Sequence, residues 1–259
     1  MTMTILVTGG TGTLGKHVVP LLRAAGRDVR VLSRAPRPAA AGIEYVTGDL
    51  LTGAGIKAAV AGVDTILHLA GGPKGDDVAT HNLVQAAQGV RHLVYIGVIA
   101  AEELPLGYFR AKYEAEQAVI GSGVPYTVLR AAQFHDLALK TVRAMAKLPV
   151  VPAPGGLRWQ SVDSREVAAR LVDLTLDEPA GRVPDLAGPE VRTLNDMIRD
   201  YLRATGKRRA LLPVRVPGKV GRLYRAGANL NLDTAEQGKR TWAEFFAEQL
   251  AKDQAAPVR

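Results

Sequence analysis

Residues 4–15 read TILVTGGTGTLG, and this stretch decides the fold. The apolar run of residues 4–8 predicts a short buried strand, and the glycines after it predict a tight turn that opens a helix. Gly9, Gly12 and Gly15 have the spacing that lets the turn approach a pyrophosphate and the helix pack closely on its strand. The free N–H groups at the start of such a helix bind anions. The stretch therefore predicts a dinucleotide site; the alternative is a plain strand–helix turn.

The composition is that of an ordinary globular chain. Its 259 residues, 47% of them hydrophobic, suffice for one large domain or two small ones. The absence of cysteine excludes disulfides, thiolate metal sites and a cysteine nucleophile, and we predict no metal site. No apolar run approaches the ~20 residues of a membrane span, and the first residues do not resemble a signal peptide. We therefore expect a cytoplasmic protein with no membrane partner.

The net charge of +8 is concentrated in one part of the chain. Eight Lys and Arg residues lie in residues 203–225, which contain no Asp or Glu. Such a stretch could bind polyanions. However, the apolar residues 211–214 interrupt it, and it contains no recognisable nucleic-acid-binding motif. We interpret it as a solvated face, or one that attracts an anionic cofactor or substrate, and expect no nucleic-acid partner. The oligomeric state stays open.

Strand and helix signals alternate through the first 150 residues. Continuous apolar runs, typical of strands buried on both faces, lie at 4–8, 28–32, 43–46, 65–69, 92–97 and 126–129. Amphipathic stretches between them predict helices at 14–25, 55–61, 78–88 and 108–120. This pattern predicts an α/β fold, a Rossmann-type doubly wound parallel sheet. We expect residues 1–150 to form an NADP-binding Rossmann domain. Residues 151–259 should form a small C-terminal substrate-covering region packed on it.

The end of the second predicted strand bears on the choice of cofactor. An acidic residue there holds the ribose hydroxyls of NAD, whereas an arginine accommodates the 2′-phosphate of NADP. Here Ser33 and Arg34 follow the strand, Arg37 comes soon after, and no carboxylate is present. Arg34 can contact a phosphate through two N–H groups. We therefore predict NADP(H) as the cofactor; the alternative is a solvated surface loop.

Tyr108 and Lys112 are four residues apart on a predicted helix and so share one face. A phenol becomes a usable proton donor near neutral pH only where a nearby cation lowers its pKa. Lys112 could supply that charge, so both residues are candidate catalytic residues. The alternative is a surface helix with a solvated lysine.

These features together resemble a known family. Along its whole length the chain is similar to an atypical short-chain dehydrogenase/reductase of the NmrA-like, NAD(P)H-binding type. The motifs that carry the resemblance are TGGTGTLG at 8–15, TGDL at 47–50, HLAG at 68–71, the Tyr108/Lys112 pair and LRAAQF at 129–134.

The resemblance implies a set of site residues. Asp49 and Leu50 should flank the adenine, Leu69 to Gly71 should line the ribose and pyrophosphate, and residues 130–134 should run beside the nicotinamide. The cofactor-binding residues it implies are Gly9, Thr11, Gly12, Thr13, Leu14, Gly15, Ser33, Arg34, Asp49, Leu50, Leu69, Ala70, Gly71, Lys112, Ala131, Gln133 and Phe134.

One position departs from the family pattern. Gly97 stands where the family usually has the Ser or Thr that steadies the substrate oxygen. His135 and Ser161 could replace that hydroxyl, or each could be ordinary structure. Two functions follow. The first is an NADPH-dependent oxidoreductase that reduces a small apolar carbonyl, quinone or imine-like substrate. The alternative is a non-catalytic regulator that senses NAD(P)H.

The substrate cover is expected from residues 134–148 and from the chain beyond Pro152, because such inserted segments usually set substrate choice. Apolar side chains there suggest a pocket, although each could equally belong to the core: Leu137, Leu139, Met145, Leu157 and Trp159.

Overall fold

The computed structural model describes residues 3–40, 42–72 and 74–255. Its contacts divide the chain into two compact units. Unit 1 comprises Met1–Glu102, Leu106–Arg130 and Arg165–Pro184, and unit 2 comprises Glu103–Pro105, Ala131–Ser164 and Asp185–Arg259. The functional division predicted at residue 150 stays a prediction.

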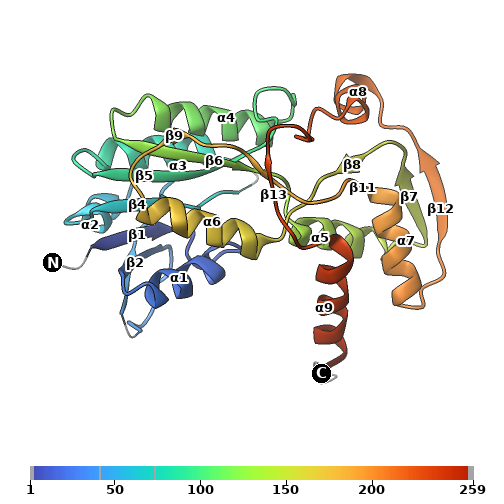
Figure 1. Ribbon diagram of the computed structural model, residues 1–259, viewed down its shortest axis with the longest axis horizontal. Helices are drawn as coiled ribbons and strands as arrows, with labels where there is room; N and C mark the ends of the chain where they lie inside the picture. The colour runs from blue at the N-terminus through green and yellow to red at the C-terminus, as the bar shows by residue number, and fades with distance from the viewer. Residues whose placement is uncertain (1–2, 41, 73, 256–259) are drawn as a thin grey trace. The chain divides into compact units, whose positions relative to one another are not determined.

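Unit 1 is built on a sheet with the strand order β3-β2-β1-β4-β5-β6 (Figure 1). β1 lies parallel to β2 and β4, β2 to β3, and β4 to β5. The short strand β9 pairs with β6. The bounds are β1 Thr4–Thr8, β2 Asp28–Ser33, β3 Ile43–Thr47, β4 Thr65–His68, β5 His92–Val98, β6 Tyr126–Ala131 and β9 Gly181–Arg182.

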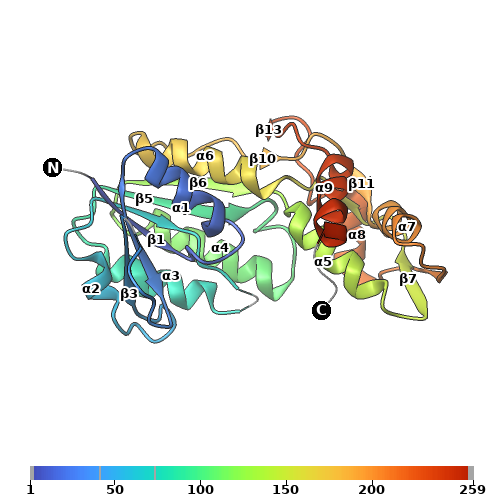
Figure 2. The ribbon, with the colours of Figure 1, turned by 90° about the horizontal axis from the view of Figure 1, so that it is seen from below.

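Helices cover both faces of this sheet. Figures 1 and 2 show α1 and α6 on one face and α2, α3 and α4 on the other. The bounds are α1 Gly15–Ala24, α2 Ile56–Val60, α3 Asp76–Ala86, α4 Gly107–Ile120 and α6 Ser164–Leu176. All residues of β4 and β5 are buried, as the continuous apolar runs predict for strands covered on both faces.

Each of the elements predicted in residues 1–150 agrees with the structure to within two residues at either end. The start of α3 differs in a way that matters, because the helix begins at Asp76 and not at Val78. Asp76 and Asp77 therefore occupy the first turn of α3, where carboxylates favour the positive end of the helix dipole.

Among the described residues, unit 2 combines four helices with short strands. Ala131, the last residue of β6, pairs with Leu186 of β10, and β10 pairs with β13. β7 and β12 form a parallel two-stranded ribbon, and β8 and β11 an antiparallel one. The helices are α5 His135–Met145, α7 Leu194–Ala204, α8 Gly218–Ala226 and α9 Trp242–Ala255. The strands are β7 Val150–Pro154, β8 Arg158–Trp159, β10 Leu186–Ala187, β11 Arg192–Thr193, β12 Ala210–Val214 and β13 Glu236–Gln237.

The strand order and the parallel pairings confirm the predicted Rossmann-type α/β class, with small additional sheets in the C-terminal part. None of the helices in the described part of the chain is long and apolar enough to cross a membrane.

Candidate active site

The glycine-rich turn between β1 and α1 is closely packed. Gly9 has a φ of +68°, and a Cβ on it would lie 2.6 Å from the backbone nitrogen of Ala70. A Cβ on Gly15 would lie 2.3 Å from the carbonyl carbon of Gly10. Only glycine fits these two positions, because real Cβ atoms do not come so close to backbone. The turn is thereby held against the end of β4, and α1 against the turn.

The start of α1 is left open for an anion. Leu14 is the N-cap, and no side chain caps the helix by a hydrogen bond. Thr11, Gly12 and Thr13 are exposed in the turn before it. The uncapped N–H groups and the dipole of α1 suit a phosphate. The structure therefore brings the predicted glycine-loop residues into an arrangement that fits a pyrophosphate.

The residues predicted to select the cofactor lie where β2 ends. The Ser33 hydroxyl donates to the carbonyl oxygen of Ala35 at 2.8 Å, which shapes the turn. Arg34 is exposed in that turn. No carboxylate occurs in residues 29–40. The turn therefore offers a guanidinium and no acidic partner for a ribose hydroxyl.

The residues predicted to flank the adenine follow β3. One Asp49 carboxylate oxygen accepts the N–H of Leu51 at 2.8 Å. The Leu50 side chain is buried in the core of unit 1, and its carbonyl accepts from the Asn82 side chain at 2.8 Å. Since its side chain points into the core, only the backbone of Leu50 is available to a ligand.

Lys112 is a buried cation at the end of β4. Its Nζ lies 3.0 Å from an Asp76 carboxylate oxygen, and both side chains are nearly inaccessible to solvent. The other Asp76 oxygen accepts the N–H of Gly72 at 2.7 Å. A Cβ on Gly71 would be 2.8 Å from Nζ, so the ammonium lies directly against the loop of residues 69–71. The structure thus brings Lys112 together with the predicted ribose-lining residues.

A chain of hydrogen bonds behind this ion pair joins β1, β4 and α3. The Thr80 hydroxyl donates to the Asp76 carbonyl at 2.7 Å, so it accepts from His68 Nε2 at 2.9 Å. His68 Nδ1 then accepts from the Thr8 hydroxyl at 2.6 Å, and Thr8 accepts the Ala70 N–H. A neutral imidazole with its proton on Nε2 makes both of these hydrogen bonds, because Nε2 donates and Nδ1 accepts. Burial, and next the charge of Lys112, lower the pKa of His68 to about 3.

Two phenols near Lys112 differ in their surroundings. Tyr95 on β5 is fully buried, and its hydroxyl donates to the Lys112 carbonyl at 3.4 Å. Burial, and next the charges of Asp76 and Glu116, raise the pKa of Tyr95 well above its ordinary value. Tyr108, in the first turn of α4, is 39% exposed. Of these two phenols, Tyr108 is the one exposed to solvent.

The space beside Gly97 is occupied by a second buried ion pair. Arg130 Nε and Nη2 each donate to a Glu116 carboxylate oxygen at 2.8 Å, and Nη1 lies 2.7 Å from Glu102. Burial acts to lower the pKa of Arg130, but the hydrogen bonds to Glu116 and Glu102 outweigh it and raise the pKa. A Cβ on Gly97 would lie 3.0 Å from a Glu116 oxygen and 3.1 Å from Arg130 Cγ. A Ser or Thr there would therefore press on this pair.

Ala131, Gln133 and Phe134 belong to unit 2. The Gln133 carbonyl accepts the N–H of Val162 at 3.1 Å, and Phe134 forms a β-bridge with Val162. Ala131 is buried and pairs with Leu186 of β10. The structure therefore orders this segment by backbone pairing, and its place beside the nicotinamide stays a prediction.

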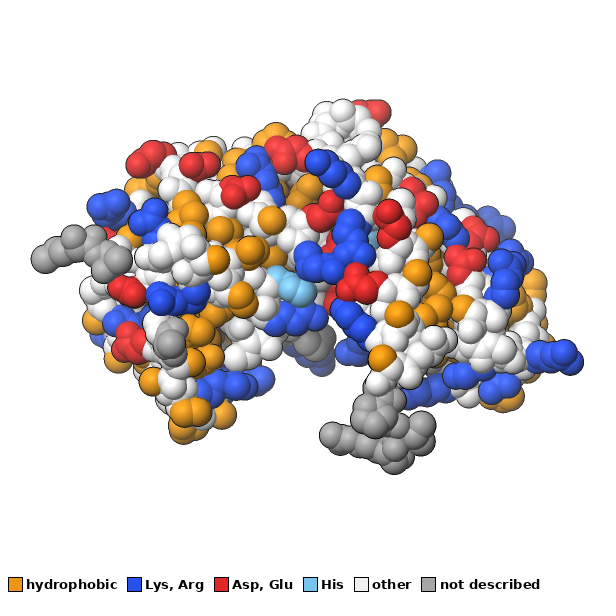
Figure 3. Space-filling view, turned by 60° about the horizontal axis from the view of Figure 1, so that its bottom comes forward, with side chains coloured by type: hydrophobic (Ala, Val, Ile, Leu, Met, Phe, Trp, Pro, Cys, Tyr) orange, Lys and Arg blue, Asp and Glu red, His pale blue; other side chains and the backbone are white. Residues whose placement is uncertain are grey.

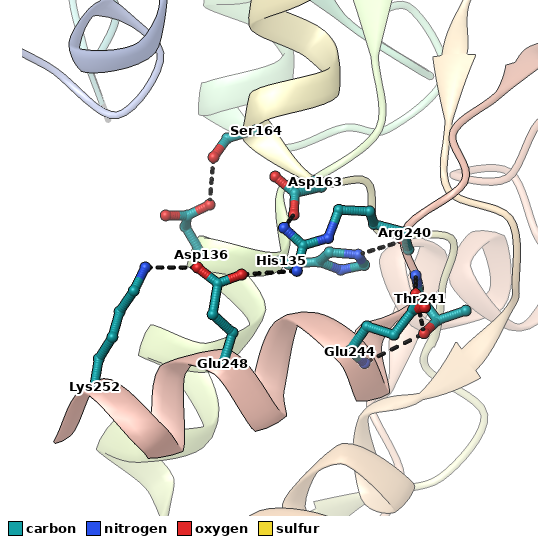
Figure 4. Close-up of polar contacts among 9 residues, drawn as sticks. All are labelled: His135, Asp136, Asp163, Ser164, Arg240, Thr241, Glu244, Glu248 and Lys252. Atoms are coloured by element: carbon teal, nitrogen blue, oxygen red, sulfur yellow. Dashed lines mark hydrogen bonds and ion pairs between the residues drawn. The ribbon is translucent and has the colours of Figure 1, made fainter. Parts of the chain in front are cut away.

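His135 and Ser161 meet each other inside unit 2. His135 Nδ1 lies 2.9 Å from the Ser161 hydroxyl. Its Nε2 donates to the Arg240 carbonyl at 3.2 Å, a contact that Figure 4 shows. His135 is 0% and Ser161 3% exposed. Around them, Ser164 donates to Asp136 at 2.7 Å, and Arg240 pairs with Asp163. These contacts give both residues a structural role, which was one of the two alternatives.

The apolar residues suggested as a substrate pocket belong mostly to the core of unit 2. Leu139 is buried in that core, and Met145, Leu157 and Trp159 pack against it. Leu137 is 46% exposed. The core includes the fully buried Trp242, and its other members come from α5 and its C-cap Ala146, β7, α7 and α9.

Sequence reasoning missed three residues that organise the site. Asp76 holds Lys112, and Glu116 and Glu102 hold Arg130. A signal existed for Glu116, which is four residues after Lys112 and so shares its helix face. The signal for Asp76 was its place in the first turn of α3, where acidic residues are favoured.

An uncapped helix after a glycine turn, at the carboxyl ends of parallel strands, is typical of a nucleotide-binding protein of the Rossmann type. Comparison with known proteins agrees: residues 9–178 match the model of a family described as NAD(P)H-binding. The chain belongs to this family, within the atypical short-chain dehydrogenases/reductases. It is an NAD(P)H-dependent oxidoreductase.

Two curated relatives and one solved structure illustrate the similarity. The (4-alkanoyl-5-oxo-2,5-dihydrofuran-3-yl)methyl phosphate reductase of Streptomyces griseus is 36% identical over 78% of this chain and 74% of its own length. Quinone oxidoreductase 2 of Escherichia coli is 29% identical over 78% of this chain and 75% of its own. An NADPH-dependent quinone oxidoreductase from Escherichia coli, solved with NADPH, superposes with a TM-score of 0.76 at 21% identity, covering 95% of this chain and 99% of that one. This last likeness concerns the fold.

Proposed function

We propose that this protein uses NADPH to reduce a small apolar carbonyl, quinone or imine-like compound. The observation that carries the proposal is the buried Asp76–Lys112 pair. It holds an ammonium against the backbone of Gly71, at the carboxyl end of β4, where the cofactor of such a sheet binds. Tyr108 lies one helical turn before Lys112 and is open to solvent.

The residues of unit 1 fit NADPH. The exposed turn at Gly12 and the uncapped start of α1 would bind the pyrophosphate. Arg34 would hold the 2′-phosphate by charged hydrogen bonds, and the absence of a carboxylate in that turn favours NADPH over NADH. The Lys112 ammonium would donate to the ribose hydroxyls. NADPH, when bound, supplies the hydride.

Tyr108 is the proton donor in this proposal. As hydride reaches the substrate carbon, the Tyr108 hydroxyl gives its proton to the substrate oxygen or nitrogen, and the positive charge of Lys112 stabilises the phenolate that forms. Tyr95 takes no part, because its raised pKa and burial keep it protonated and out of reach. Without a hydroxyl at Gly97, the substrate oxygen has one hydrogen-bond donor fewer, so we expect modest turnover.

The names of the relatives support the proposed substrate in part. The quinone oxidoreductase supports the quinone among the proposed substrates. The other relative is a reductase of a methyl phosphate, whose charge sets its substrate apart from an apolar one. Neither name identifies the compound that this chain reduces.

The test is NADPH consumption across a panel of quinones, ketones and imines, with Tyr108→Phe as the variant and Tyr113→Phe as its control. Tyr113 is a 36% exposed tyrosine on the same helix. General acid catalysis contributes typically ~10²–10⁴-fold, so Tyr108→Phe should lower kcat by about that factor with NADPH binding nearly intact. Unchanged turnover in Tyr108→Phe would remove the phenol from the mechanism. Tight NADPH binding with no turnover on any substrate would favour the sensing role.

A further inference from the structure

The positive charge of the protein is concentrated in two segments of unit 2. Residues 203–225 carry eight Lys and Arg and no Asp or Glu. The charge of this segment, +8, equals the net charge of the whole chain. Residues 137–162 carry four more cations and again no acidic residue. Seven of the eight cations of the first segment are exposed. None of the eight forms an ion pair with a carboxylate in the part of the chain that the structure describes.

The fold brings these two segments side by side. β7 and β12 pair in parallel, with Val150 opposite Ala210 and Leu212 opposite Pro152. The basic residues that precede each strand therefore lie at the same end of the ribbon: Lys147 before β7, and Lys207, Arg208 and Arg209 before β12. Figure 3 shows Lys and Arg side chains beside hydrophobic ones on the right, the side on which Figure 1 draws β7 and β12.

The exposed face of the ribbon is aliphatic. Val151 and Leu211 point into the core of unit 2, so their neighbours along each strand point outward. Leu212 is 55%, Val150 48% and Leu148 44% exposed. We call β7, β12, Leu148 and the four basic residues before the strands the ribbon surface. Three large aliphatic side chains gathered among cations differ from the single exposed ones that are normal on proteins.

A basic hollow adjoins the ribbon surface. It has a volume of about 560 Å³, and its lining includes five cations: Arg199, Arg203, Lys207, Arg208 and Arg209. Lys207 and both arginines before β12 thus belong to the hollow and to the ribbon surface alike. A partner of this region must carry several negative charges and also accept apolar side chains.

We propose that the ribbon surface docks on an anionic lipid bilayer. Lipid headgroups attract clustered Lys and Arg, and the acyl boundary accepts aliphatic side chains at the same depth. A nucleic acid would use the cations but not Leu148, Val150 and Leu212, and the ribbon surface has no aromatic or amide side chain to contact bases. The proposal departs from our expectation that no membrane is a partner. That expectation considered only spanning segments, and the sequence did not reveal that β7 pairs with β12.

Co-sedimentation with vesicles tests this. The full chain is mixed with vesicles of phosphatidylglycerol and phosphatidylcholine, or of phosphatidylcholine alone. The variant is Arg208→Glu/Arg209→Glu, and the control is Lys57→Glu/Arg91→Glu, which makes the same charge change at exposed positions of unit 1. Each cation near an anionic surface contributes about fivefold, so the variant should bind at least about 30-fold more weakly. The control should bind as the wild type does, and high salt should release the protein.

A second variant separates a membrane from other polyanions. Leu212→Ser should weaken vesicle binding severalfold and leave any binding to a labelled duplex DNA unchanged. Binding to neutral vesicles, equal losses in variant and control, or a DNA affinity above the vesicle affinity at the same salt would overturn the proposal. NADPH binding by each variant, measured in parallel, shows that it is folded and keeps this test independent of the proposed chemistry.

Discussion

Two groups of cations, one in each unit, have opposite surroundings. In unit 1, the Lys112 and Arg130 side chains are only 7% and 4% exposed, and each pairs with a buried carboxylate. In unit 2, residues 203–225 leave most of their cations exposed, with no carboxylate paired to them among the described residues. A buried charge needs a paired partner, and that partner fixes its position, as an active site requires. An exposed charge is free to meet a partner.

The largest expected effect comes from breaking a buried pair of unit 1. Glu116 is 1% exposed and accepts two hydrogen bonds from Arg130. Glu116→Gln should lower the free energy of unfolding by about 3–5 kcal/mol, because the loss of one partner leaves a buried charge uncompensated. Urea unfolding measures this. The matched control is Glu102→Gln, which removes a 41% exposed partner of the same arginine and should cost about 1 kcal/mol or less. Equal costs would show that burial does not set the strength of these pairs.

An exposed cation of unit 1 sharpens the comparison, because we propose that its partner is the cofactor. Arg34→Ala should weaken NADPH binding by roughly tenfold to over a hundredfold, since a charged hydrogen bond contributes about 1.5–3 kcal/mol. NADH binding should not change. Calorimetric titration of both cofactors measures this, and equal affinity of the wild type for NADPH and NADH would remove Arg34 from cofactor selection.

The third effect is a pH dependence of stability that originates in unit 1. The pKa of buried His68 is lowered to about 3, whereas an unfolded histidine takes up a proton near pH 6.5. Between these values the unfolded state binds one proton more, so stability falls as the pH falls. From pH 7 to pH 5 the free energy of unfolding should fall by about 2 kcal/mol more in the wild type than in His68→Gln. Urea unfolding of the wild type and of His68→Gln at both pH values measures this difference. An equal fall in the free energy of unfolding for the two proteins would contradict a neutral buried imidazole.

The smallest effect is expected at an exposed pair of unit 2. Arg143 on α5 pairs with Asp253 on α9, and their side chains are 37% and 54% exposed. Arg143→Ala should change the free energy of unfolding by about 0.2–1 kcal/mol, because solvent screens such pairs. A loss of unfolding free energy as large as that expected for Glu116→Gln would show that buried and exposed ion pairs do not differ in strength here.

The sheet was predictable from sequence because its strands are continuous apolar runs. β1 agrees with its prediction in full, and the others differ by at most two residues at an end. The start of α3 differs from the prediction by two residues, because Asp76 and Asp77 lie outside the amphipathic stretch although acidic residues are typical of a first helical turn.

The partners of the site residues could not be predicted in the same way. Lys112 is visible as a candidate in the sequence, but its pairing with Asp76 depends on how α3 and α4 lie next to each other. The packing of the Glu116–Arg130 pair against Gly97 likewise appears only once β5, β6 and α4 are in place. Local sequence indicates elements and chemically suitable residues, whereas contacts between distant segments need the fold.

Asp76 holds the Lys112 ammonium against Gly71, where we propose that the cofactor binds. Calorimetric titration of NADPH into the wild type, Asp76→Asn, Lys112→Met and the double variant tests it most directly. Asn keeps an oxygen for the Gly72 N–H and loses only the charge. Each single variant should bind NADPH about tenfold more weakly or worse. The double variant should lose little more, because the two residues act as one unit. Binding by Asp76→Asn with wild-type affinity, while Lys112→Met is impaired, would contradict the claim.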